Sequence, residues 1–207
     1  YYSLLECQDS LKPILSNRYT SEYPYKIAAK TYFNKNVRLK ENVYDTKLSA
    51  EFPLHLAQNI YLHKSYKDTV YQQIINSPVN PSPKYLYSDL GNYLFHLTIE
   101  DIAGEYLYPL VFNKFYLRIG AETLGYLPLN RFPKENIVPT ENDVVFRKQL
   151  LQGYVHDPGA AMLGGISGHA GLFSNANDLA KMMQMYLNDG VYAGKRFISD
   201  TIIHKFT

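Results

Sequence analysis

The sequence predicts an α+β fold in which helices predominate. Apolar residues recur at the spacing of a helix face in residues 90–97 and again in residues 179–187. Candidates for strands are few and short. Hydrophobic residues make up 46% and charged residues 19% of the 207 residues, which is ordinary for a folded globular chain. We expect one domain with a core of its own, or a large part of one.

The N-terminal half begins with little pattern. Residues 1–48 carry weak periodicity and predict no regular structure, and a polar cluster at residues 34–42 is typical of an exposed loop. Pro53 then fits the first turn of a short helix over residues 54–61. Apolar residues at helical spacing indicate a second helix over residues 70–75.

A proline-rich loop at residues 78–83 precedes the next expected helix, which spans residues 90–104 with Ser88 or Asp89 as its cap. A further helix should follow Pro109.

The C-terminal half should contain two more helices and a loop. One helix, capped by Asn142 or Asp143, is expected to run to about Leu151. Glycines make residues 164–173, the glycine-rich loop, unsuited to a helix, so a loop leading into a short strand is expected. Ser174 is placed to cap the last helix, whose apolar face lies in residues 179–187.

Composition disfavours several classes of function. The net charge is only +2 and the basic residues are scattered, so nucleic acid is not an expected partner. No apolar stretch reaches the roughly 18 residues of a membrane span. Cys7 is the single cysteine, and the six histidines lack His-Glu-x-x-His spacing, so neither a metal nor a cofactor is predicted. The twenty tyrosines predict half-buried packing or, alternatively, a carbohydrate-binding surface.

Two segments carry a family resemblance. Residues 84–93, with Tyr87-Ser88-Asp89 at their centre, resemble the second motif of the class C β-lactamase-like, penicillin-binding serine hydrolases. Residues 153–180 are still more similar to a bacterial branch that is often appended to a family 3 glycoside hydrolase. The resemblance implies the helical portion of a β-lactamase-like domain with little of its antiparallel sheet. We expect a single, partial domain over residues 1–207, with 1–48 as a weakly patterned segment and 49–207 as the family-like region.

The resemblance also assigns roles. Tyr87 becomes a general-base candidate and Asp89 a hydrogen-bonding partner within the site, while Ser88 and His169 become candidates for substrate binding. A phenol with an ordinary pKa of about 10 works near neutrality only beside a cation that stabilises its phenolate. The alternative is structural: Tyr87 packs at a helix entrance, Ser88 and Asp89 cap amides, and His169 is a structural or rim histidine.

The nucleophile of such a site is missing. In the family a Ser-x-x-Lys turn places the serine beside the amine that takes its proton. No serine here has a lysine three positions later. The serines are Ser3, Ser10, Ser16, Ser21, Ser49, Ser65, Ser77, Ser82, Ser88, Ser167, Ser174 and Ser199.

Two other segments refine this expectation. His169-Ala170-Gly171 is similar to the segment before the third family motif, which is therefore expected beyond Thr207. Residues 4–13 resemble a degraded copy of the segment after Ser-x-x-Lys, which would lie before Tyr1. Asp157 follows His156, but adjacent side chains seldom face each other, and an Asp before Pro is a natural helix cap.

Three interpretations stay open. The first is a serine hydrolase that cleaves amides or esters by acyl-enzyme chemistry, incomplete or inactive in this chain. The second is a non-catalytic cell-wall or carbohydrate-binding module, or a structural one, derived from that family. In the third, a separate chain supplies the missing parts. The resemblance suggests a small molecule or a cell-wall peptide or glycan as ligand, an adjacent glycoside hydrolase domain as partner, and a periplasmic or secreted location.

Overall fold

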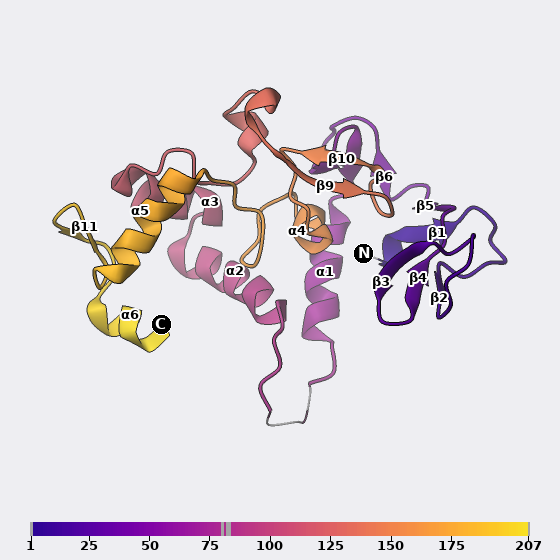
Figure 1. Ribbon diagram of the computed structural model, residues 1–207, viewed down its shortest axis with the longest axis horizontal. Coiled ribbons are helices and arrows are strands. Elements are labelled where there is room, and N and C mark those ends of the chain that lie inside the picture. Colours follow the sequence, from indigo (N-terminus) through magenta and orange to yellow (C-terminus); the bar gives the residue numbers. More distant parts are fainter. Residues whose placement is uncertain (1, 80, 82–83, 207) are drawn as a thin grey trace.

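The computed structural model describes residues 2–79, 81 and 84–206. It confirms the mixed α+β class, with 35% helix and 19% strand in small antiparallel sheets. Figure 1 shows the N-terminal strands at one end of the molecule, helices α1, α2 and α4 in the middle, and α5 and α6 at the other end. No helix among these residues is long and apolar enough to cross a membrane.

Helices provide the middle and the C-terminal end. The α-helices are α1 (Ser65–Ile75), α2 (Leu90–Ala103), α3 (Leu107–Val111), α4 (Pro158–Met162), α5 (Ala176–Leu187) and α6 (Asp200–Phe206). A π-helical turn, η2 (Phe112–Tyr116), follows α3 directly, and the 3-10 turns are η1 (Tyr2–Leu4), η3 (Leu117–Ile119), η4 (Pro128–Asn130) and η5 (Lys134–Asn136).

The strands are short, and every strand pair among the described residues is antiparallel. They are β1 (Leu5–Cys7), β2 (Leu15–Ser16), β3 (Tyr25–Ala28), β4 (Thr31–Phe33), β5 (Val37–Leu39), β6 (Tyr44–Asp45), β7 (Leu54–Ala57), β8 (Ile60–Leu62), β9 (Pro139–Asp143), β10 (Gln149–Gln152), β11 (Val191–Tyr192) and β12 (Lys195–Arg196). The sheets have the orders β1-β5, β2-β4-β3, β6-β8-β7, β10-β9 and β11-β12.

Two expected helices are wrong, because both segments form hairpins. In residues 54–62 Leu54 pairs with Leu62, and Asn59 turns the chain at a φ of 58°. In residues 139–152, Asp143 caps no helix: it pairs with Gln149, and its carboxylate accepts the amide of Phe146 within the turn. Asn and Asp favour such turns because they tolerate left-handed backbone or bind nearby amides. Over so few residues, a helical and a strand spacing of apolar side chains look alike.

The N-terminal strands were also not expected. Strands β1 to β6 fall within residues 1–48, each two to four residues long, too short for alternation to show in the sequence. Cys7 closes β1 with 7% of its surface exposed, and its thiol donates a hydrogen bond to the carbonyl of Pro13 at 3.3 Å. Burial, followed by the nearby charge of Asp9, raises the pKa of this thiol.

The three longest helices were expected from the sequence. Helix α1 covers residues 65–75, and α2 ends at Gly104, whose φ of 67° suits a left-handed C-cap. Helix α5 forms, but its cap is Asn175 rather than Ser174: the Asn175 side chain accepts the Asp178 amide at 2.8 Å.

The expected apolar face of α5 is not its buried side. Leu179 and Leu187 are 49% and 78% exposed, whereas Asp178 and Met185 are buried. Asp178 accepts hydrogen bonds from Thr123 and Lys181, which is how a buried carboxylate avoids the cost of desolvation.

Within the part of the chain that the structure describes, the core has three clusters. The largest joins the N-terminal strands and β7–β8 to α4 and the β9–β10 turn. Its buried members are Leu4, Leu5, Cys7, Phe33, Val37, Leu39, Val43, Leu56, Leu62, Phe146, Val155, Ala160, Ala161 and Met162. A second joins η2 and η3 to α5, through Tyr116, Ile119, Ala121 and Leu124. The third, Tyr71, Tyr93 and Leu163, packs α1 and α2 on the residue after α4.

Candidate functional site

The second motif lies at the start of α2. Tyr87 is 73% exposed, and its hydroxyl donates to Oδ1 of Asp89 at 2.8 Å. The Leu90 amide donates to the hydroxyl oxygen of Ser88 at 3.2 Å, whereas the Asp89 side chain caps no helix amide. The motif therefore stands in solvent, with Ser88 holding the first amide of the helix.

The contact with Asp89 governs the ionisation of Tyr87. The hydrogen bond to Asp89, and then its negative charge, raise the pKa of Tyr87. A base needs the opposite shift, because its phenolate must be accessible near neutral pH. In this arrangement Tyr87 is a hydrogen-bond donor.

A second group of polar side chains lies inside the molecule, around His169. Ser167 Oγ and His169 Nδ1 are 2.9 Å apart, and His169 Nε2 and Asp157 Oδ1 are also 2.9 Å apart. Ser167 is 1% exposed, and the side chains of His169 and Asp157 are 4% and 30% exposed. The three residues form a continuous chain that joins the glycine-rich loop to the N-terminus of α4.

Asp157 determines which ring nitrogen of His169 carries a proton. Burial opposes its ionisation, but hydrogen bonds from His169 and from the Ala160 amide outweigh burial, so the pKa of Asp157 lies below its ordinary value. An ionised carboxylate only accepts hydrogen bonds, so His169 carries a proton on Nε2. In the neutral ring, Nδ1 then accepts the hydroxyl proton of Ser167.

The same loop rests on α2 one turn beyond the motif. The ring of Tyr93 stacks on that of His169, with centroids 4.2 Å apart. Gly168 lies against the α2 backbone so closely that an added Cβ would be 2.3 Å from the carbonyl oxygen of Asn92. Burial, and then the charge of Asp157, raise the pKa of Tyr93. The structure thus brings His169 to α2, but to Tyr93 rather than to Tyr87.

Arg147 holds the segment that leads into Asp157. Its side chain is fully buried and donates to the carbonyls of Val155 at 2.7 Å and His156 at 2.6 Å, and to Asp143 at 2.8 Å. Burial opposes ionisation of Asp143, but hydrogen bonds from Arg147 and from turn amides keep the pKa of Asp143 low. His156 therefore uses its backbone to position this segment, and Asp157 pairs with His169 instead of with its neighbour.

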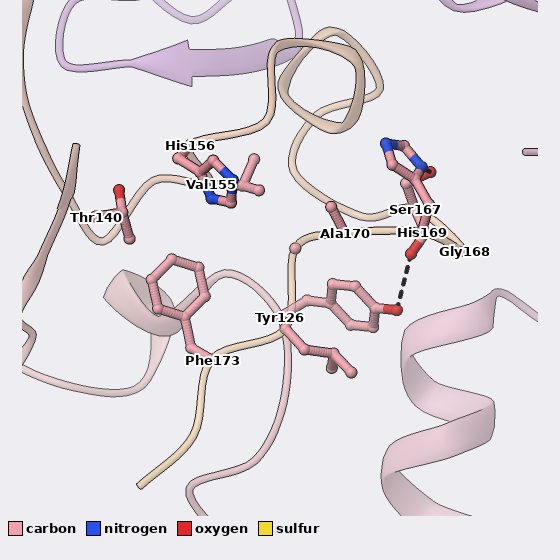
Figure 2. Close-up of a pocket in the computed structure, with 11 residues that line it drawn as sticks. Tyr126, Thr140, Val155, His156, Ser167, Gly168, His169, Ala170 and Phe173 are labelled. Carbon is pink, nitrogen blue, oxygen red and sulfur yellow. Dashed lines mark hydrogen bonds between the residues drawn. The ribbon is translucent and has the colours of Figure 1, made fainter. Parts of the chain in front are cut away.

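A cavity of about 380 Å³ lies beside the glycine-rich loop, whose residues form part of its lining. In Figure 2 the hydroxyl of Tyr126 donates to the carbonyl of Ser167, and the His169 ring lies across the loop backbone from Tyr126. The lining residues are Tyr126, Thr140, Val155, His156, Ser167, Gly168, His169, Ala170, Gly171, Leu172 and Phe173. A neighbouring cavity of about 450 Å³ shares His156 with it.

The order serine, histidine, carboxylate is that of a nucleophilic triad. Here the serine is 1% exposed, and the imidazole stacks on the ring of Tyr93. The arrangement can hold a proton and fix a loop, but it offers no open approach to a carbonyl carbon. Sequence reasoning missed the set because Asp157 and His169 are twelve residues apart, although the Asp-Pro cap was a signal for one end of it.

A second buried histidine lies farther along α2. His96 Nε2 lies 3.0 Å from Oε1 of Glu100, and its Nδ1 lies 3.5 Å from the hydroxyl of Tyr71 on α1. Glu100 also accepts the Leu107 amide at 2.8 Å, at the start of α3. Within the described residues, no group of three or more His, Cys, Asp or Glu side chains could hold a metal ion.

Comparison with known proteins identifies relatives. Proteins of Salmonella newport (strain SL254), Salmonella agona (strain SL483) and Salmonella enteritidis PT4, each provisionally named D-alanyl-D-alanine carboxypeptidase, are 33% identical to this chain over 160 residues. The match covers 70% of this chain and 37% of each relative, so the chain spans little more than a third of their length. No family model and no solved structure matches. The chain is thus related to proteins that carry this provisional name, which is that of a penicillin-binding serine hydrolase family.

Proposed function

We propose that this chain is part of a β-lactamase-like domain of the D-alanyl-D-alanine carboxypeptidase type, in which it supplies the second motif. Residues 49–207 would form the family-like region, and residues 1–48 would lead into it. The ligands would be cell-wall peptides that end in D-alanine, and the β-lactams that mimic them. The observation that carries this proposal is the 33% identity to the Salmonella proteins. The exposed Tyr87-Ser88-Asp89 motif at the start of α2 supports it.

The residues of this chain would bind rather than attack. Tyr87 and Ser88 carry hydroxyls beside the Asp89 carboxylate, in an exposed position where a peptide can reach them. Acyl transfer needs a nucleophile whose proton is removed as it attacks the carbonyl. Because no serine here has a lysine three positions later, that step would need a group from outside these residues. Tyr87 would then become a base only if the added group were cationic and offset the charge of Asp89.

A binding experiment tests this proposal. N-acetyl-lysyl-D-alanyl-D-alanine is titrated into ¹⁵N-labelled protein, with the L-alanyl-L-alanine peptide as matched control. We expect saturable shifts of the Ser88, Asp89 and Leu90 amides with the D,D peptide and weaker shifts with the L,L peptide. A fluorescent penicillin and a fluorophosphonate should leave no covalent adduct on this chain. Equal response to both peptides, or none, would contradict the proposal.

A second candidate function is a non-catalytic module that binds glycans. Several exposed tyrosines favour it, because aromatic rings in solvent can stack on sugar rings and offer a hydroxyl. Tyr19, Tyr85, Tyr87 and Tyr106 are 67%, 90%, 73% and 74% exposed. Titration with chitooligosaccharides and muropeptides separates the two candidates. Saturable binding of the sugars, with no response to the D,D peptide, would favour the glycan module. An adjacent glycoside hydrolase domain and a periplasmic or secreted location stay predictions.

A further inference from the structure

The buried chain Asp157–His169–Ser167 joins the start of α4 to the glycine-rich loop, and the stacking of His169 on Tyr93 adds α2, which is distant in the sequence. We propose that His169 is a positioning residue: through Asp157, Ser167 and Tyr93 it fixes the first turn of α2, and with it the second motif, against the glycine-rich loop. The consequence for ligand binding rests on the proposed function, whereas the consequence for α2 does not.

The first part of the argument is that His169 has two directed contacts and one stacking contact. Its Nε2 lies 2.9 Å from Asp157 at the start of α4, and its Nδ1 lies 2.9 Å from Ser167 on its own loop. Its ring stacks on Tyr93 in the first turn of α2 with an interplanar angle of 29°. Two hydrogen bonds fix the plane of the imidazole, and that plane in turn fixes the face offered to Tyr93.

The second part is that the backbone at Gly168 and Gly159 packs tightly against the first turn of α2. An added Cβ on Gly168 would be 2.3 Å from the Asn92 carbonyl oxygen, and one on Gly159 would be 1.8 Å from the Tyr93 hydroxyl oxygen. Tyr93 is therefore confined between the loop and the first turn of α4. If the His169 ring moves away, Tyr93 therefore cannot fill the space by a small shift.

The third part is the double use of one oxygen. Oδ1 of Asp157 accepts both the Ala160 amide at 2.7 Å and His169. The helix cap of α4 thus holds the carboxylate for the imidazole. Loss of the His169 contact leaves an ionised, partly buried carboxylate with one partner fewer, which is costly.

Helix α2 itself contains a histidine that serves as a matched comparison for His169. His96 is as buried as His169 and is likewise paired with a carboxylate, Glu100. Its contacts lead to Tyr71 on α1 and, through Glu100, to the Leu107 amide of α3. A defect at His96 should therefore loosen the C-terminal part of α2, and a defect at His169 the N-terminal part.

Two substitutions of His169 distinguish loss of the hydrogen bond to Asp157 from loss of the imidazole ring. In His169→Gln the terminal amide nitrogen can take the place of Nε2 and donate to Asp157, whereas in His169→Asn the shorter side chain reaches only the place of Nδ1. The measurement is native-state hydrogen exchange of the Asn92 and Tyr93 amides. We expect exchange to be faster by about tenfold or more in His169→Asn, the factor expected from losing a hydrogen bond to a charged group, and by much less in His169→Gln.

The control is His96→Asn, in which exchange should rise at the Glu100 and Gly104 amides more than at Asn92 and Tyr93. Equal exchange at Asn92 and Tyr93 in the Asn and Gln variants of His169 would overturn the proposal. So would an effect of His96→Asn on these two amides as large as that of His169→Asn.

Ligand binding is read separately with N-acetyl-lysyl-D-alanyl-D-alanine. If the unmodified protein binds this peptide, affinity should fall in His169→Asn and be largely restored in His169→Gln. An unchanged affinity in His169→Asn would overturn the link between His169 and the second motif. If the unmodified protein does not bind, the proposed function fails, while the exchange rates of Asn92 and Tyr93 still decide whether His169 fixes α2.

Discussion

The hydroxyl of Tyr87 donates a hydrogen bond to Oδ1 of Asp89, 2.8 Å away and two residues later. The residue expected to act as a base is thus bound to an anion, and this contact raises its pKa. The relationship is local and exposed, so it can be tested without disturbing the core.

Asp89→Asn should lower the pKa of Tyr87 toward its ordinary value of about 10, because the variant removes the carboxylate that accepts the hydrogen bond of the phenol and whose negative charge disfavours the phenolate. The measurement is a pH titration of the Tyr87 ring carbon by NMR, with the signal assigned from Tyr87→Phe. Ser88→Ala is the matched control and should leave the titration where it is. A pKa of Tyr87 that stays the same in Asp89→Asn would contradict this account.

Arg147→Met should destabilise the protein by about 3–5 kcal/mol, because it leaves the buried Asp143 carboxylate without its cation and two carbonyls without a donor. The free energy of unfolding is measured by urea denaturation. Arg38→Met removes the half-exposed pair with Glu6 and should cost less than about 1 kcal/mol. Similar losses in the two variants would show that burial of Arg147 does not matter.

Gly168→Ala should destabilise by about 1–3 kcal/mol, because the new methyl group meets the backbone carbonyl of Asn92 and neither segment can yield easily. The control is Gly91, which lies on α2 beside Asn92 and has nothing within 4 Å of an added Cβ. Gly91→Ala should therefore be neutral or stabilise by up to about 1 kcal/mol. Thermal unfolding of both variants gives the comparison, and a loss in Gly91→Ala equal to that in Gly168→Ala would argue against a steric cause.

Acid should weaken the fold through three carboxylates. Despite burial, hydrogen bonds hold the pKa values of Asp143, Asp157 and Asp178 below the ordinary value. In the unfolded chain these groups take up protons near pH 4, whereas in the folded chain they do so only at lower pH. Their stabilisation is therefore complete above about pH 4 and is lost as pH falls through the lower folded values. Urea midpoints measured from pH 6 to pH 2 test this, and Asp157→Asn should show a shallower dependence on pH than the unmodified protein.

Sequence reasoning succeeded where one element is long and its signals agree. Helix α2 has apolar residues at helical spacing over fourteen residues and a glycine at its end, and it forms as expected. The pairs β7–β8 and β9–β10 were wrongly expected to be helices, because each strand has at most five residues and the deciding signal was the turn. For α5 the helix was right but its buried side was wrong, since Asp178 is buried through partners distant in the sequence.

In the candidate site, too, residues that are adjacent in the sequence could be predicted, and residues that only the fold brings together could not. Tyr87, Ser88 and Asp89 are contiguous, so a motif could reveal them. The pair Asp157 and His169 depends on how the glycine-rich loop folds back onto α4, which no local pattern encodes. The sequence offered His156 as a partner for Asp157, but backbone geometry turns adjacent side chains apart.

Cys7 gives this molecule an internal reporter. Its thiol lies buried on β1, bonded to the Pro13 carbonyl, and its raised pKa keeps it in the poorly nucleophilic protonated form. Disulfide exchange with an added aromatic reagent must then wait for β1 to separate from β5. Since the sequence holds no other sulfhydryl group, the colour released over time would count how often this one sheet opens, undisturbed by events at α2 or α5.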